Sequence, residues 1–126
     1  MRQQTKLTFQ IGYAKRNPRF ESLVAHAASV ICGGCTVALA TGFWADDGAE
    51  KGLNIFEGKV QQEHTFQLEL TCENAKLETA YEVMCEAIAH WAQVERVNTD
   101  WVHVSQTPII GRHFSVKARQ QATATA

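Results

Sequence analysis

His64–Cys72 reads HTFQLELTC, and its alternation of apolar and polar side chains is the clearest structural signal in the chain. Phe66, Leu68 and Leu70 fall on one face at a spacing of two residues, which indicates a strand with one buried face. The earlier stretch Lys6–Gly12, KLTFQIG, alternates in the same way. Two such strands, each followed by a helical pattern, predict an α+β fold.

The helical patterns occupy residues 18–31 and about 75–94. In both stretches apolar residues recur at spacings of three and four, which is typical of a helix with one buried face. Asn17 and Asn74 are expected to cap the starts of the two helices, and Gly33-Gly34 is expected to end the first.

The remaining strands complete a known order of elements. Residues 36–43 read as the second strand, and residues 101–105 and 112–116 as the last strand or strands. The order βαββαβ predicts a ferredoxin-like sandwich, an antiparallel sheet with two helices on one face. We expect one domain over residues 1–117, followed by a disordered tail at residues 118–126.

Residues 44–63, between the second and third strands, are the least regular part of the chain. A loop of this length in a small domain is usually functional or mobile. It could also fold as a hairpin around Leu53–Phe56.

Composition excludes several classes of function. The chain has 126 residues, 45% of them hydrophobic, and a formal net charge of -1. No basic face is evident, so nucleic-acid binding is not expected. No apolar stretch approaches the length of a membrane span, and the first residues lack the apolar segment of a signal peptide. We therefore expect a cytoplasmic protein that binds no membrane.

Four cysteines are present, and two of them form the pattern Cys32-Gly33-Gly34-Cys35. This spacing occurs in redox and zinc sites. Here, however, it follows the first helix, whereas a thioredoxin-type pair starts a helix, and no second pair of ligands completes a zinc site. We expect small buried thiols and no bound metal or cofactor.

Three places could bind a small molecule. An aromatic at the end of the second strand can stack on a purine or lie against a sulfonium cation. A carboxylate at the start of the third strand can hold a cationic group, and a polar turn after residue 104 offers hydrogen bonds. A core or interface aromatic, a solvated charge and an ordinary turn are the structural alternatives. The candidate residues are Gly42, Phe43, Trp44, Glu63, Ser105 and Gln106.

In this order, these residues resemble the phage-encoded S-adenosylmethionine lyases, formerly called hydrolases. The resemblance covers most of residues 7–114. The segments that carry it are Gly42-Phe43-Trp44, Glu63-His64-Thr65, His90-Trp91, Val104-Ser105-Gln106-Thr107 and Gly111.

The resemblance implies a fold, an assembly and a reaction. The family forms ferredoxin-like trimers with sites between subunits, and splits S-adenosylmethionine into 5'-methylthioadenosine and homoserine lactone without a cofactor. Removal of this methyl donor is an anti-restriction activity in the cytoplasm of the infected bacterium. By this resemblance Glu63 is the catalytic residue, and the substrate-binding residues are Gly42, Phe43, Trp44, Ser105 and Gln106.

The chain departs from the family pattern at one aromatic position. The family has Tyr where this chain has Trp44, and Tyr13 or Tyr81 could supply the missing hydroxyl. The stretch from this aromatic to the glutamate is also longer by several residues, so Glu57 competes with Glu63 for the carboxylate role.

A non-enzymatic oligomeric protein of the same fold, which binds a ligand or a partner, is the alternative function. A polypeptide-binding regulator that uses the long loop is another. The face of the sheet without helices is expected to mix apolar and polar side chains, which suits a subunit interface better than open solvent. A homotrimer is therefore expected. The side chains expected on that face include Ala38, Ala40, Gln67, Glu69, Trp101 and His103.

Overall fold

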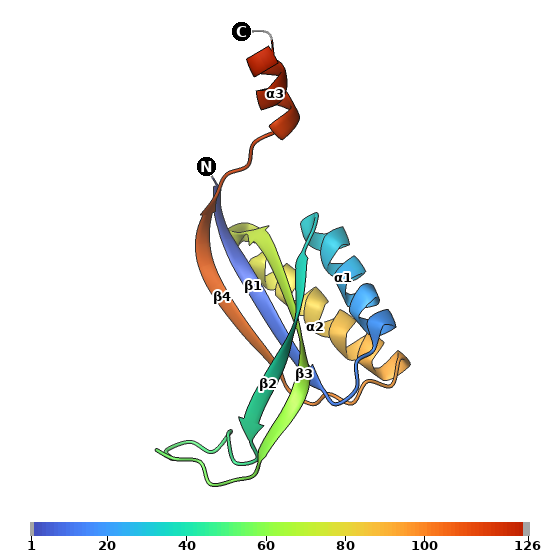
Figure 1. Cartoon of the computed structure of the whole chain (residues 1–126), viewed down its shortest axis with the longest axis vertical. Helices are drawn as coiled ribbons and strands as arrows, with labels where there is room; N and C mark the ends of the chain where they lie inside the picture. The colour runs from blue at the N-terminus through green and yellow to red at the C-terminus, as the bar shows by residue number, and fades with distance from the viewer. Residues whose placement is uncertain (1, 125–126) are drawn as a thin grey trace.

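The computed structural model, in which residues 2–124 are described, has a four-stranded antiparallel sheet with two helices on one face (Figure 1). The strand order is β2-β3-β1-β4. Together with the element order βαββαβ, which one further C-terminal helix follows, this confirms the predicted ferredoxin-like fold. The elements are β1 (Arg2–Tyr13), α1 (Pro18–Cys32), β2 (Thr36–Ala45), β3 (Val60–Glu73), a short 3-10 helix (Asn74–Lys76), α2 (Leu77–Val94), β4 (Val102–Gly111) and α3 (Val116–Ala124).

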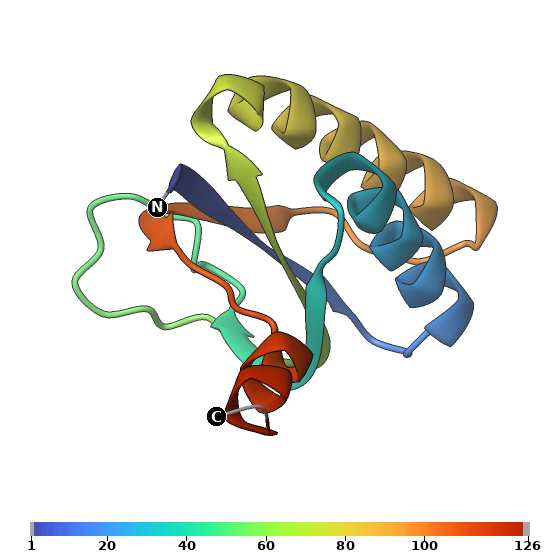
Figure 2. The ribbon, with the colours of Figure 1, turned by 90° about the horizontal axis from the view of Figure 1, so that it is seen from above.

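The core lies between the two central strands and the two long helices, which sit on the same side of the sheet (Figure 2). Strands β1 and β3 pair along most of their length, so their alternating apolar residues meet on one face. Phe20 and Val24 of α1 and Met84 of α2 cover this face and are fully buried. The strand residues of the core are Leu7, Phe9, Ile11, Tyr13, Phe66, Leu68 and Leu70.

The first helix begins and ends as its sequence predicts. The Asn17 side chain accepts a hydrogen bond from the Phe20 amide at 3.0 Å, and Pro18 occupies the first helical position. Gly33 ends the helix with φ of 83°, a conformation that favours glycine.

The expected cap at Asn74 is wrong. Asn74 lies in the 3-10 helix that precedes α2, and its side chain accepts a hydrogen bond from Thr5 Oγ1 at 2.7 Å. Thr5 is buried on β1 and needs an acceptor there, so the side chain of Asn74 satisfies a tertiary contact.

The strand β2 lies at the edge of the sheet, outside the cover of the helices. On its helix side Val37, Leu39 and Phe43 are 48%, 53% and 66% exposed. The other edge of β2 pairs with no strand among residues 2–124. An apolar stripe along an unpaired edge is typical of a surface that another chain covers.

The C-terminal part differs from its prediction in two places. Residues 112–116 are not a strand, because β4 ends at Gly111 and α3 begins at Val116. The tail was expected to be disordered from residue 118, but α3 extends to Ala124; residues 125–126 lie outside the described part. The sequence Lys-Ala-Arg-Gln-Gln is rich in strong helix formers, and Ser115 Oγ accepts a hydrogen bond from the Ala118 amide.

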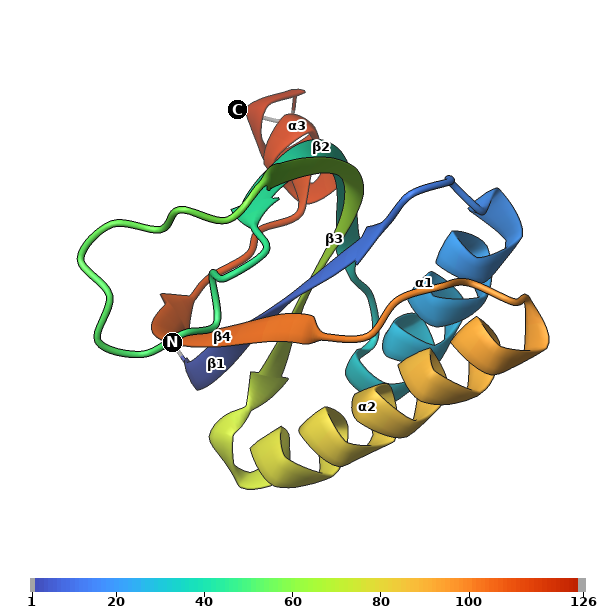
Figure 3. The same ribbon diagram turned by 90° about the horizontal axis from the view of Figure 1, so that it is seen from below.

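The long loop is shorter than predicted, because β2 and β3 extend to Ala45 and from Val60. No hairpin forms around residues 53–56. The Asp47 side chain instead accepts a hydrogen bond from the Glu57 amide at 2.9 Å, across the base of the loop. The loop extends away from α1 and α2 (Figure 3).

Candidate functional site

A hollow of about 480 Å³ lies on the face of the sheet opposite the helices. The strand register places Gly42 of β2 opposite Glu63 of β3, and Thr65 of β3 opposite Gly12 of β1. The hollow is therefore built on three neighbouring strands. We call it the Glu63 hollow; its lining includes Gly12, Gly42, Trp44, Glu63, Trp101 and His103.

The Glu63 side chain reaches across the sheet and lies over Gly12. A Cβ atom at position 12 would collide with Glu63 Oε1, so the missing side chain of Gly12 makes room for the carboxylate. Gly42 does the same for Thr65, whose Oγ1 would be 2.5 Å from a Cβ at position 42. Glycine weakens a strand interior and often marks a close approach of other atoms. Two strand glycines thus shape the floor of the Glu63 hollow.

The Glu63 carboxylate has no hydrogen-bond or ion-pair partner within residues 2–124. The residue is half-buried. A carboxylate that has lost part of its hydration gains from a cationic partner. The Glu63 hollow consequently carries a negative charge that is available to a ligand.

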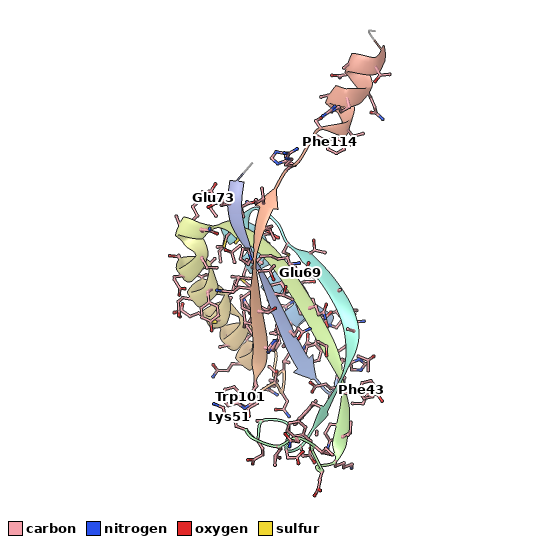
Figure 4. The ribbon with its side chains drawn as sticks, turned by 90° about the vertical axis from the view of Figure 1, so that its left-hand side faces the viewer. Phe43, Lys51, Glu69, Glu73, Trp101 and Phe114 are labelled. Carbon is pink, nitrogen blue, oxygen red and sulfur yellow. The ribbon has the colours of Figure 1, made fainter. Side chains whose placement is uncertain are left out.

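Two indole rings flank this carboxylate. Trp44 comes from β2 and Trp101 directly precedes β4, so the strand order β2-β3-β1-β4 places them on opposite sides of Glu63. Trp44 is 48% exposed and Trp101 is 86% exposed. In Figure 4 Trp101 and Phe43 lie at the same end of the sheet, beside β4 and β2 respectively. Indole faces attract cations more strongly than other side-chain rings do.

Four of the six predicted site residues line the Glu63 hollow: Gly42, Phe43, Trp44 and Glu63. Strand alternation gives Phe43 a different role from its neighbours, since it turns its ring toward the helix side of β2 while Trp44 faces the hollow.

Ser105 and Gln106 lie elsewhere. Both belong to β4 and not to the predicted turn. Ser105 is on the same face as Glu63 but opposite Thr8, farther along the sheet. Gln106 is opposite Leu7, a core residue, so Gln106 faces the helix side. Neither residue lines the Glu63 hollow.

The alternatives to Trp44 and Glu63 also lie outside this hollow. The buried Tyr13 hydroxyl donates a hydrogen bond to Glu21 of α1, on the helix side. Tyr81 belongs to α2 and lines a groove of about 450 Å³ between α2 and β4. Glu57 is an exposed loop residue. The tyrosine hydroxyl of the family pattern therefore has no counterpart in the Glu63 hollow of a single chain.

Sequence reasoning assigned Trp101 and His103 to the open face but not to a site, and it did not single out Gly12. The signal for Gly12 was present, because a glycine ends the otherwise regular alternation of KLTFQIG. The signal for Trp101 was not, because its distance from Glu63 in sequence reveals nothing about the register between β1 and β4.

The expectation of small buried thiols holds for Cys72, whereas Cys32, Cys35 and Cys85 are half-buried. Burial raises the pKa of the Cys72 thiol, and burial followed by the neighbouring Cys72 raises the pKa of Cys32. A raised pKa keeps a thiol protonated, whereas the thiolate is the reactive form. No disulfide joins the four cysteines.

Residues 2–124 contain no group of three or more His, Cys, Asp or Glu side chains that could hold a metal ion. In the same part of the chain no helix is long and apolar enough to cross a membrane.

No family model and no curated protein sequence matches the chain. Among solved structures, CutA1 from Oryza sativa is 12% identical with a TM-score of 0.48, over 86% of this chain and 84% of that one. The periplasmic divalent cation tolerance protein CutA from Archaeoglobus fulgidus is 8% identical with a TM-score of 0.42, over 95% and 97%. A hydantoinase/carbamoylase family amidase from Burkholderia ambifaria is 14% identical with a TM-score of 0.41, over 86% of this chain and 28% of the amidase. Similarities this low carry no argument about function.

Proposed function

We propose that this protein is a homo-oligomeric ligand-binding protein that takes a small organic cation into the Glu63 hollow. One observation carries the proposal. The Glu63 carboxylate lies over Gly12 without an ion-pair partner in the described chain, and Trp44 and Trp101 flank it.

The chemistry of the three side chains is complementary. Glu63 supplies the charge, which attracts a cation and fixes its position over β1. The indole of Trp44 can stack on a flat ring or on the cation itself, at about 0.5–2 kcal/mol per cation–π contact. A ligand that joins a flat aromatic ring to a cationic centre uses both features.

S-adenosylmethionine is the probe with these properties, and S-adenosylhomocysteine is the matched compound without the charge on sulfur. The two differ by one methyl group and by the positive charge on sulfur. We expect calorimetry to show tighter binding of the sulfonium compound, by about 10-fold for about 1.4 kcal/mol of charge interaction. Equal affinities, or no binding of either compound, would contradict the proposal.

A second candidate function is S-adenosylmethionine lyase activity. The observation in its favour is that Gly42, Trp44 and Glu63, which carry the sequence resemblance, come from two strands and line one hollow. In this reaction a carboxylate oxygen of the substrate attacks its own γ-carbon. The carbon–sulfur bond breaks, and its electron pair stays on sulfur as a neutral thioether.

This reaction needs no nucleophile or metal from the protein, since the substrate supplies both reacting groups. The site has to fold the substrate so that its carboxylate approaches the γ-carbon. Sulfur loses its charge as the bond breaks, so a carboxylate beside the sulfonium contributes to binding more than to rate. Glu63 beside the α-ammonium group would instead orient the attacking end.

Product analysis separates the two candidate functions. A lyase releases 5'-methylthioadenosine and homoserine lactone, and NMR detects the lactone before it hydrolyses to homoserine. Binding of S-adenosylmethionine without any product after long incubation at high protein concentration would leave the ligand-binding function and rule out the lyase.

A further inference from the structure

We infer that Trp101 is the second aromatic wall of the Glu63 hollow, and that the site selects onium cations, such as sulfonium or quaternary ammonium, over primary ammonium ions. This inference rests on the proposed cation-binding function and names the class of cation.

The strand register places Trp101 beside Gly12. The pairing of β1 with β4 ends at Ile11 opposite Val102, so one further step brings Trp101 next to Gly12. Val102 is half-buried and packs against the core on the helix side. Alternation therefore turns the indole of Trp101 to the open face.

Gly12 contributes no side chain between the indole and the carboxylate. Glu63 reaches over β1 at Gly12, which has no Cβ, and Trp101 lies on the far side of that glycine. Trp101 is 86% exposed, so the described chain covers little of it. A cation that pairs with Glu63 over Gly12 would contact this ring on one side and reach toward Trp44 on the other.

This arrangement suits alkylated cations. An onium ion has no N–H group to donate, is weakly hydrated, and presents methyl or methylene groups with partial positive charge to a ring face. Aromatic walls around a carboxylate are a recurrent way to bind such ions. A primary ammonium ion loses stronger hydration, and the one carboxylate of the hollow, with the side chains of Gln10, Thr65 and His103 beside it, has to replace three donated hydrogen bonds.

The experiment compares three ligands of one shape. S-adenosylmethionine carries a sulfonium, S-adenosylhomocysteine a neutral thioether, and a third analogue carries a carbon with a primary amine in place of the methylated sulfur. Stopped-flow tryptophan fluorescence reads binding before any turnover. We expect the wild-type protein to prefer the sulfonium over the primary amine by about 3- to 30-fold, the range of a cation–π contact.

Variants of the exposed ring identify its role. Trp101→Leu should lower sulfonium affinity by about 3- to 30-fold and change thioether affinity by less than about 2-fold, while Trp101→Phe keeps most of the sulfonium affinity. Phe114→Leu is the control, because Phe114 is a 69% exposed aromatic outside the hollow. Circular dichroism checks that each variant is folded.

The outcomes separate the inference from the function on which it rests. Unchanged sulfonium binding in Trp101→Leu, or equal losses for all three ligands, would contradict the selectivity for onium ions. Either result would leave the proposed cation site unaffected. Equal wild-type affinity for sulfonium and primary amine would also contradict this selectivity. Failure of the wild-type protein to bind any of the three ligands would overturn both the inference and the proposed function.

Discussion

Gly12 shows how one absent side chain can define a site. Replacing it with alanine puts a Cβ where the Glu63 carboxylate lies, and the carboxylate has to move. We expect Gly12→Ala to weaken cation binding by about 10-fold, the equivalent of about 1.4 kcal/mol, while the protein stays folded. Calorimetry with S-adenosylmethionine measures the change.

Gly34→Ala is the matched control for this substitution. A Cβ at position 34 meets nothing within 4 Å, so this variant should bind like the wild type. Wild-type affinity in Gly12→Ala would show that the position of the carboxylate does not matter for binding.

Glu63→Gln removes the charge of the proposed site and keeps its shape. We expect a loss of about 10- to 100-fold in sulfonium affinity and a smaller loss for the thioether, because the two ligands share the α-ammonium group and differ in the charge on sulfur. Glu57→Gln is the control, since Glu57 is an exposed carboxylate outside the hollow. If Glu63→Gln lowered the affinity for both ligands equally, the shape of the site and not the charge of Glu63 would account for the loss.

Tyr13 links the stability of the fold to pH. Burial raises the pKa of Tyr13 above its ordinary value of 10.0, and its hydrogen bond to Glu21 and the charge of Glu21 raise it further. The folded state therefore keeps a proton that the unfolded state releases above about pH 10. The protonated Tyr13 therefore contributes its full share to the free energy of unfolding below about pH 10. This stabilisation is lost as the pH rises further, by at most about 1.4 kcal/mol per pH unit.

Urea unfolding between pH 8 and 11 measures this contribution as the difference between wild type and Tyr13→Phe. The variant should be less stable by about 1–3 kcal/mol at pH 8, because Glu21 loses a buried donor and keeps its ion pair with Arg16, 2.8 Å away. The difference should shrink above pH 10. If the stability difference between wild type and Tyr13→Phe stayed constant up to pH 11, the raised pKa of Tyr13 would be contradicted.

At the scale of single elements, Asn17 connects the two long helices. Its side chain accepts from the Phe20 amide at the start of α1 and donates to the Glu95 carbonyl at the end of α2, at 3.3 Å. Asn17→Ala should lower the free energy of unfolding by about 1–2 kcal/mol, since both the cap and the connection are lost. Denaturant titration measures the change. Asn98→Ala, at an exposed loop position, should have little effect, and a similar loss in both variants would contradict the role of Asn17.

Elements were predictable where one local pattern decided them. Alternation located β1 and β3, and Asn17-Pro18 located the start of α1. The prediction for Asn74 was wrong because its side chain accepts a hydrogen bond from Thr5 and does not cap the helix. The prediction for Gln106 was wrong because the Thr-Pro pair that follows it is typical of a turn. Residues 102–111 instead form one strand, and the position of Gln106 in that strand decides which face of the sheet it is on. The site was half predictable for the same reason: Trp44 and Glu63 stand out locally, whereas Gly12 and Trp101 meet Glu63 only through strand pairing.

At the scale of the whole molecule, a single chain leaves its sheet incompletely covered. Val37, Leu39 and Phe43 remain exposed on one side of β2. Helices α1 and α2 pack over the centre of one face and leave the opposite face uncovered (Figure 2). Burying apolar surface contributes about 25 cal/mol per Å², so association of such surfaces is favourable. We therefore expect a homo-oligomer, with a trimer as the predicted state.

Light scattering on a size-exclusion column tests this assembly directly. The wild type should elute with a mass of three chains at micromolar concentration, and Leu39→Lys should shift it toward a single chain, because the ammonium group would be buried at an apolar contact. Val94→Lys is the matched control, since Val94 is 52% exposed but lies at the end of α2, away from β2. A wild-type mass of one chain would contradict the prediction. Loss of S-adenosylmethionine binding in Leu39→Lys but not in Val94→Lys would further mean that the Glu63 hollow requires a neighbouring subunit, whereas retained binding in the dissociated variant would place the whole site within one chain.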